Sequence, residues 1–194
     1  MNLEVLRRHE IEGEEREAML AAANEEVEEL STLVSEIVDL ATDRYEEEPK
    51  SDVDLGEVVA AVAERTTRRN GRPVEVDTDG TVVVGRREAL ERAVANIVAN
   101  ADKWAPEGSP ILVTVEDGTV TVIDEGPGIA DADIEHIFER FYRGDAARST
   151  VGSGLGLSIV DTIVADHEGT TFAANRSEGG AAIGFTLPVG DPST

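Results

Sequence analysis

Residues 110–124, PILVTVEDGTVTVID, restrict the fold of this chain more than any other segment. Two runs rich in β-branched residues, 110–116 and 119–124, flank the dipeptide Asp117-Gly118. Asp-Gly between two such runs is a strong signal for a tight turn between antiparallel strands. The segment therefore predicts a β-hairpin.

The rest of residues 53–188 alternates between helical and strand patterns. We expect helices over 55–69, 86–104 and 154–167, with a short helix near 131–138. Strands are expected over 73–77, 81–84, 170–175 and 181–187, the last two joined through Gly179-Gly180. This mixture predicts an α+β fold class, a two-layer α/β sandwich in which helices cover one face of a mixed sheet.

The N-terminal quarter has a different pattern. Within residues 15–47, apolar side chains recur at alternating spacings of three and four, as in a coiled-coil seam. Residues 2–9 resemble the end of an earlier helix, so a helical hairpin with unequal arms is expected. Such a hairpin cannot cover its own seam, which favours a dimeric bundle or a first helix that is incomplete here. Pro49 lies in the predicted linker 46–52, giving domains 1–48 and 49–194.

Composition excludes several classes of protein. The chain has 194 residues, is 40% hydrophobic and contains no cysteine, so neither disulfides nor thiolate metal sites are possible. The net charge of −24 disfavours nucleic acid and anionic membranes as partners. No apolar run reaches the roughly 20 residues of a membrane span, and the N-terminus does not resemble a signal peptide.

Residues 96–104 raise the possibility of a ligand site. Asn96, Asn100 and Lys103 follow an i, i+4, i+7 spacing and share one face of the predicted helix, with Trp104 beside them. The plainer interpretation is a hydrated helix end whose asparagines make local hydrogen bonds. The alternative is a site for metal and phosphate, since amide oxygens can bind Mg²⁺ and a lysine can contact phosphate.

Two glycine-rich stretches and one aromatic stretch follow. DEGPGI (124–129) ends a strand, and GSGLGLSIV (152–160) leads into a helix whose N-terminus can bind an anion. Between them, IFERFYR (137–143) combines aromatic and arginine side chains. Taken alone, GSGLGLSIV is weakly specific and DEGPGI is of middling specificity, because glycine loops and Gly-Pro turns are common. The aromatics of 137–143 could be core residues, whereas three arginines within nine residues are unusual in so acidic a protein.

Taken together and in this order, the stretches resemble the catalytic, ATP-binding domain of sensor histidine kinases. This domain belongs to the superfamily shared with gyrase, heat-shock chaperone ATPases and mismatch-repair ATPases. NIVANADKW resembles the N box, DEGPGI the G1 box, IFERFYR the F box and GSGLGLSIV the G2 box. The resemblance covers roughly residues 52–188, and the preceding hairpin resembles the end of the family's dimerisation domain.

The resemblance implies a role for each matching residue. Asn100, helped by Asn96, would hold Mg²⁺, while Lys103 and Arg143 would contact the phosphates of ATP. Trp104 would lie beside the adenine and Asp124 would bind its amino group. The other implied nucleotide-binding residues are Gly126, Gly128, Ile129, Tyr142, Gly152, Gly154, Leu155, Gly156 and Leu157. The implied cofactors are ATP and Mg²⁺.

The family's phosphoacceptor histidine has no clear counterpart. His9-Glu10 has the acidic neighbour, but no proline follows and Gly13 interrupts the helix. The resemblance thus implies the cytoplasmic core of a membrane-anchored, homodimeric histidine kinase that relays phosphate to a response regulator receiver domain, here unable to phosphorylate itself. Two alternatives remain: an anti-sigma-factor-type serine kinase, and a nucleotide-gated interaction module without transfer chemistry.

Overall fold

The computed structural model describes residues 19, 48–144 and 153–189. The predicted helical hairpin, the domain boundary at 48/49, His9 and Gly152 depend on residues outside these ranges and stay predictions. Among the described residues, no helix has the length and apolar character that crossing a membrane requires.

Ten elements follow one another in the described chain. The helices are α3 (Leu55–Asn70), α4 (Arg87–Trp104) and α5 (Gly156–Asp166). The strands are β1 (Ser51–Asp54), β2 (Val74–Thr78), β3 (Val82–Gly85), β4 (Ile111–Glu116), β5 (Thr119–Ile123), β6 (Thr170–Asn175) and β7 (Ala181–Thr186).

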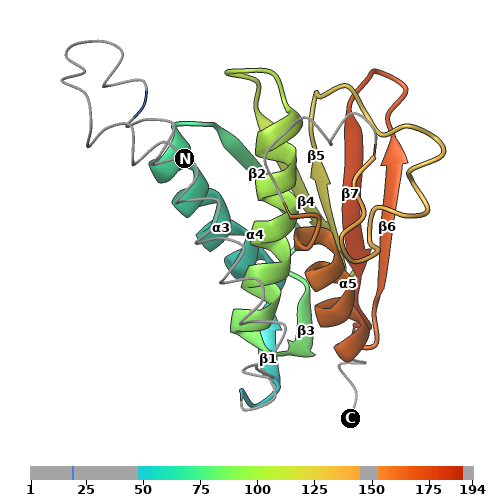
Figure 1. The fold of residues 1–194 in the computed structure, drawn as a ribbon. Coiled ribbons are helices and arrows are strands. Elements are labelled where there is room, and N and C mark those ends of the chain that lie inside the picture. The colour runs from blue at the N-terminus through green and yellow to red at the C-terminus, as the bar shows by residue number, and fades with distance from the viewer. Residues whose placement is uncertain (1–18, 20–47, 145–152, 190–194) are drawn as a thin grey trace, which may run out of the picture.

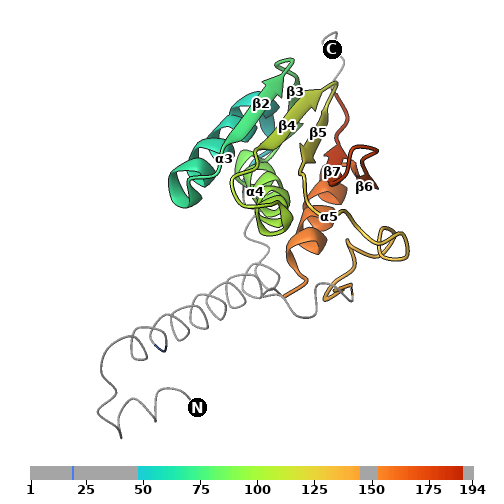
Figure 2. The ribbon, with the colours of Figure 1, turned by 90° about the horizontal axis from the view of Figure 1, so that it is seen from above.

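The main sheet has five strands in the order β2-β4-β5-β7-β6. The β2 and β4 strands are parallel, whereas the other neighbouring pairs are antiparallel. A separate two-stranded sheet pairs β1 with β3. All three helices lie on the same face of the main sheet, which Figures 1 and 2 show from two directions. The predicted α+β sandwich with a mixed sheet is therefore confirmed.

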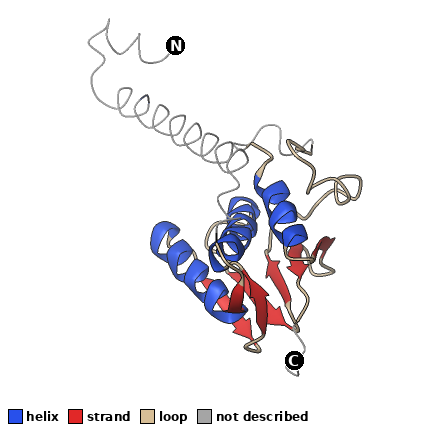
Figure 3. Cartoon of the chain, turned by 90° about the horizontal axis from the view of Figure 1, so that it is seen from below, coloured by secondary structure: helices blue, strands red, loops and turns tan. Residues whose placement is uncertain are grey.

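The hydrophobic core lies between the helices and the sheet. Alternating residues of β4 and β5 point into it: Val113, Val115, Val120 and Val122 are at most 3% exposed. They meet the apolar side of α4, and Phe185 of β7 is fully buried beside them. Figure 3 shows the three helices packed as one layer over the strands. This layer fixes α4, the helix with the two asparagines, against the centre of the sheet.

Local sequence explains the element ends. The side chain of Asp54 caps α3 by accepting hydrogen bonds from the Gly56 and Glu57 amides, at 2.8 and 3.2 Å. Gly71 ends α3 in the left-handed conformation, with φ of 71°. In the β4–β5 hairpin, Asp117 and Gly118 both have positive φ, as the two central residues of a type I′ turn do.

Two expectations about elements were wrong. Ser51–Asp54, partly assigned to the linker, form β1, because these residues pair with the distant β3 and local sequence carries no signal for that pairing. No helix forms over 131–138. The backbone makes successive turns instead, in which the Asp133 amide donates to Ala130 and the His136 amide to Asp133. A segment this short has too few bonds to offset the cost of helix nucleation.

Candidate functional site

The predicted stripe of Asn96, Asn100 and Lys103 lies on one face of α4, and we call it the α4 stripe. All three residues fall within the helix, so their spacing places them on successive turns of one face. The opposite face, which includes Val94, Ile97, Val98 and Ala101, is buried against the core. The predicted division of α4 into a polar face and a core face is therefore confirmed.

Asn96 makes one of the local bonds that the plainer interpretation expects. Its Nδ2 donates to the Arg92 carbonyl oxygen at 3.1 Å, one turn earlier on α4. Its Oδ1 lies toward Gly156, where an added Cβ would be 3.3 Å away. The asparagine oxygen thus faces the first residue of α5, which brings the α4 stripe beside the G2 box.

The last turn of α4 carries Lys103 and Trp104. Lys103 is exposed, and its Nζ lies 5.1 Å from the centre of the Trp104 ring in a cation–π contact. The Trp104 carbonyl oxygen packs against Gly126, where a Cβ would lie only 2.8 Å away. Gly126 therefore lets residues 124–129, the G1 loop, approach the end of α4.

Asp124 is one of the few buried charged side chains in the described chain, at 4% exposure. Its Oδ1 accepts a hydrogen bond from the Gly126 amide at 2.7 Å and another from the Ala181 amide at 3.3 Å. These two donors come from the G1 loop and from β7. The carboxylate is consequently fixed in position by backbone groups on both sides.

Asn175, at the end of β6, holds the other end of the G1 loop. Its Oδ1 accepts from the Ile129 amide at 2.7 Å, and its Nδ2 donates to the Ile129 carbonyl oxygen at 2.6 Å. The side chain also lies against Gly128, which has φ of 79° and where a Cβ would be 2.7 Å from Asn175 Oδ1. Our sequence analysis missed Asn175, because only the fold brings it beside Gly128 and Ile129.

The β6–β7 turn closes over the start of the G1 loop. Gly180 has φ of 85° and is buried, and an added Cβ there would overlap the carbonyl oxygen of Asp124. Arg176 Nη1 donates to the same oxygen at 3.3 Å. Gly180, which was predicted only as part of a strand connection, thus also shapes the G1 loop.

The F box contacts the G2 box through backbone. Phe141 has φ of 63° and is 67% exposed, and its amide donates to the Gly154 carbonyl oxygen at 3.0 Å. A Cβ on Gly154 would lie 2.8 Å from the Tyr142 carbonyl oxygen and 3.1 Å from Arg143 Cγ. Gly154 is therefore needed for these segments to meet, and Arg143 lies beside it.

Side-chain bonds organise the turns before the F box. The Tyr142 hydroxyl donates to Asp133 Oδ1 at 2.7 Å, and the Tyr142 ring lies against His136. His136 Nδ1 is 2.7 Å from Glu139 Oε1. This hydrogen bond to Glu139, with the negative charges of Glu139, Glu135 and Asp133, raises the pKa of His136 above its ordinary 6.5.

The N-cap residue of α5 is Leu155, whose side chain makes no capping hydrogen bond. Leu155 is buried, with 1% exposure, while Gly156 and Leu157 are half-buried. Ser153 Oγ accepts from the Leu155 amide at 3.0 Å. Of the predicted G2-box residues, Gly154 lies beside the F box and Gly156 beside Asn96, while Leu155 is in the core and Leu157 packs against it. Gly152 lies outside the described residues.

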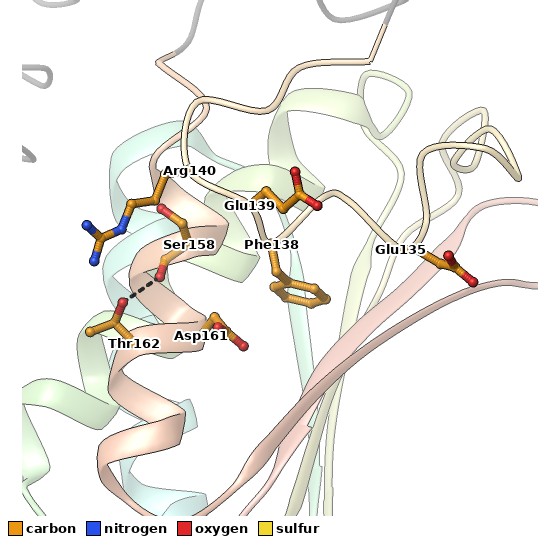
Figure 4. Close-up of a pocket in the computed structure, with 7 residues that line it drawn as sticks. All are labelled: Glu135, Phe138, Glu139, Arg140, Ser158, Asp161 and Thr162. Carbon is orange, nitrogen blue, oxygen red and sulfur yellow. Dashed lines mark hydrogen bonds between the residues drawn. The ribbon is translucent and has the colours of Figure 1, made fainter.

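A hollow of about 380 Å³ lies elsewhere, between the turn segment and α5 (Figure 4). Its lining residues are Glu135, Phe138, Glu139, Arg140, Ser158, Asp161 and Thr162. Some of them lie in the F and G2 boxes, but the resemblance assigns a nucleotide contact to none of them, and three are carboxylates that would repel phosphate. We therefore place the candidate site at the α4 stripe and the G1 loop and not at this hollow.

The described residues contain no group of three or more His, Asp or Glu side chains arranged to hold a metal ion. A cation at the α4 stripe would instead use amide oxygens, a ligand type that Mg²⁺ accepts. The arrangement is a helix end with two asparagines and a lysine, beside a glycine loop with a fixed carboxylate. This arrangement is the candidate site, and it is the one that the resemblance to a histidine kinase ATPase domain predicts.

Comparison with known proteins agrees with this class. Residues 85–191 match the model of the family described as histidine kinase-, DNA gyrase B-, and HSP90-like ATPase. The chain belongs to this family, and its described part has the fold of the catalytic domain of sensor histidine kinases.

Individual relatives within this family are sensor histidine kinases. The signal transduction histidine-protein kinase/phosphatase MprB of Mycobacterium sp. (strain KMS) is 39% identical over 182 residues, which are 91% of this chain and 35% of that protein. This chain thus spans about a third of the length of such relatives. A structure of the mycobacterial sensor histidine kinase MprB is 35% identical, with a TM-score of 0.64 over 72% of this chain and 97% of that one.

A second solved structure covers more of the chain. Full-length ShkA in complex with AMPPNP is 25% identical, with a TM-score of 0.66 over 95% of this chain and 42% of ShkA. The predicted resemblance to sensor histidine kinases is therefore confirmed.

Proposed function

We propose that this chain is the ATP-binding core of a sensor histidine kinase, which binds Mg-ATP and transfers the γ-phosphoryl group to a histidine. The observation that carries the proposal is the meeting of α4 with the G1 loop. There the Trp104 carbonyl oxygen lies against Gly126, next to the fixed carboxylate of Asp124. The Asp124 carboxylate, our candidate for binding adenine, therefore lies near the end of the helix that carries the α4 stripe.

The α4 stripe suits Mg²⁺ and phosphate. Asn96 uses its Nδ2 in the bond to Arg92, which turns its Oδ1 toward Gly156. Asn96 and Asn100 would hold Mg²⁺ through neutral oxygens, and the metal would neutralise phosphate charge. Lys103 and Arg143 would contact the phosphates as cations.

The G1 loop suits adenine. Asp124 would accept a hydrogen bond from the exocyclic amine, and Gly126, Gly128 and Ile129 would shape the pocket. Trp104 would offer its ring face to the base. Tyr142, Gly152, Gly154, Leu155, Gly156 and Leu157 would close over the phosphates. AMPPNP, the ligand named for ShkA, is an ATP analogue, which supports a nucleotide of this type.

Phosphoryl transfer needs positioning and charge neutralisation more than covalent chemistry from the protein. The γ-phosphoryl group would pass from ATP to an imidazole nitrogen of a dimerisation domain, with ADP leaving, and then to a receiver domain of a response regulator. The chain would act within a homodimer that is anchored to the membrane by segments outside this sequence.

Transfer can be tested with γ-labelled ATP and a separate acceptor domain from the MprB protein of Mycobacterium sp. (strain KMS). We expect Mg²⁺-dependent label that is stable to base and lost in acid, as phosphohistidine is. Asn100→Ala should abolish it. Labelled serine would indicate a serine kinase instead, and binding of ATP without any labelled acceptor would indicate a nucleotide-gated interaction module.

A further inference from the structure

Arg72 makes several polar contacts at once and is mostly buried. It follows Gly71 in the connection between α3 and β2, and its side chain is 12% exposed. By contrast, Arg65 pairs with Glu91 at the surface and is 55% exposed. A buried guanidinium with its donors engaged fixes its surroundings far more than a surface ion pair does.

The partners of Arg72 all belong to the end of α4 and the loop after it. Nε forms an ion pair with Asp102, whose side chain is 22% exposed. Nη1 donates to the carbonyl oxygens of Pro106 at 2.9 Å and Ser109 at 2.8 Å. Nη2 lies 3.4 Å from the Asp102 carbonyl oxygen and 3.5 Å from that of Ala105.

These contacts supply what a helix C-terminus lacks. The last carbonyl groups of a helix have no partners within it, and a cation there also interacts favourably with the helix dipole. Asp102 is further held by Asn70, whose Nδ2 donates to its second oxygen at 2.6 Å. Asn70 and Arg72, at the end of α3 and just after it, thus hold the last turn of α4 in position.

The same turn carries the site. Asn100, Lys103 and Trp104 flank Asp102 and Ala105, and the Trp104 carbonyl oxygen rests against Gly126. Arg72 also balances the negative charge of Asp102, which would otherwise stand next to Lys103, close to where phosphates would bind. Displacing this turn would move the Trp104 ring, the Lys103 ammonium group and Asn100, the proposed metal ligand, together.

We propose that Arg72 is a positioning residue for nucleotide binding, which acts through Asp102 and the carbonyl groups after α4. The part of the proposal that concerns affinity rests on the proposed function. The part that concerns the geometry of the α4 end does not, because Trp104 is the chain's only tryptophan and its fluorescence reports that geometry without ligand.

The test compares Arg72→Ala with Arg65→Ala, which removes an ion pair from the other end of α4. We expect Arg72→Ala to shift Trp104 emission in the absence of nucleotide and to weaken binding of Mg-AMP-PNP about tenfold. Arg65→Ala should leave the Trp104 emission unchanged and the affinity for Mg-AMP-PNP within about twofold of that of the unmodified chain. Arg72→Lys keeps the charge but not the planar set of donors, so it should restore only part of the affinity.

Unchanged emission and affinity in Arg72→Ala, or equal changes in both alanine variants, would overturn the proposal. Should Arg72→Ala fail to fold by circular dichroism, Arg72→Lys decides: wild-type emission and affinity there would also overturn it. If the unmodified chain binds no nucleotide, the proposed function fails, and Trp104 emission alone still decides whether Arg72 positions the turn.

Discussion

The G1 loop and the α4 stripe form two sides of one candidate site, but they are built differently. The G1 loop is held by hydrogen bonds between side chains and backbone groups. The Asp124 carboxylate accepts from the Gly126 and Ala181 amides, and the Asn175 side chain bonds to both the amide and the carbonyl of Ile129. The α4 stripe consists of side chains that project from a helix whose other face forms the core.

This difference has a consequence for mutation. Changes around the G1 loop should lower fold stability and ligand affinity together, because the same contacts serve both. Changes on the α4 stripe should lower affinity alone, because those side chains contribute little to the core. The predictions below test this contrast.

Gly180→Ala should have the largest effect. Its Cβ would overlap the Asp124 carbonyl oxygen, and φ at this position is 85°. We expect a loss of about 2–3 kcal/mol of unfolding free energy, or roughly 5–10 °C in the thermal midpoint. Differential scanning calorimetry measures it. Gly179→Ala is the control, because φ is again positive there but nothing lies within 4 Å of an added Cβ. Equal losses of unfolding free energy in the two variants would show that backbone strain, and not the contact with Asp124, is responsible.

Asn100→Ala should separate affinity from stability. If Asn100 is the metal ligand that we propose, its removal should weaken Mg²⁺-dependent nucleotide binding by roughly ten- to hundredfold. The thermal midpoint without ligand should stay nearly unchanged, because Asn100 is not one of the buried residues of α4. Titration and thermal melts on the same preparation measure the two quantities. A large drop in midpoint would instead support a structural role for the asparagine at the helix end.

Asn175→Ala should loosen the G1 loop without overpacking it. Two hydrogen bonds to Ile129 are lost, so we expect about 1–2 kcal/mol of destabilisation and a several-fold weaker affinity for nucleotide. Thr171→Ala is a matched control on the same strand, since its hydroxyl bonds to Asp161 and not to the loop. The contrast between the two regions would be wrong if both variants bound nucleotide like the unmodified chain.

The His136–Glu139 pair should give the smallest effect. Since the pKa of His136 is raised, the favourable interaction is complete below about pH 6.5 and is lost as pH rises through the raised pKa. Glu139→Gln should bring the pKa of His136 back toward its ordinary value. Titration of the His136 ring signals by NMR checks this, and an identical pKa in both proteins would remove Glu139 as the cause.

The amino-acid sequence was sufficient to predict the features that depend on residues close together in the chain. The spacing within 86–104 predicted a helix with a polar and an apolar face, and Asp117-Gly118 predicted the β4–β5 hairpin, and both are present. The order of the four boxes predicted the family. These features are set by residues close together in the chain.

The missed features depend on contacts between distant residues. Asn175 reaches Ile129 across 46 positions, and Arg72 reaches Asp102 across 30, so neither has a local signature. The short β1 exists because β3 pairs with it. The helix expected near 131–138 failed for the opposite reason, since its local pattern was too short to outweigh the turns. Asn96 shows a mixture: its local bond to Arg92 fits the plainer interpretation, while its oxygen faces Gly156.

The most direct test of the account is calorimetric titration of the full chain with AMP-PNP, with and without Mg²⁺. We predict saturable binding with one nucleotide per chain, much weaker when Mg²⁺ is removed or when Asn100 is replaced by alanine. Asp124→Asn should weaken binding in both conditions, because it alters the group that we propose binds the adenine amine. Absence of binding in the presence of Mg²⁺, or binding that neither Mg²⁺ nor Asn100 affects, would contradict a metal–nucleotide site at the α4 stripe.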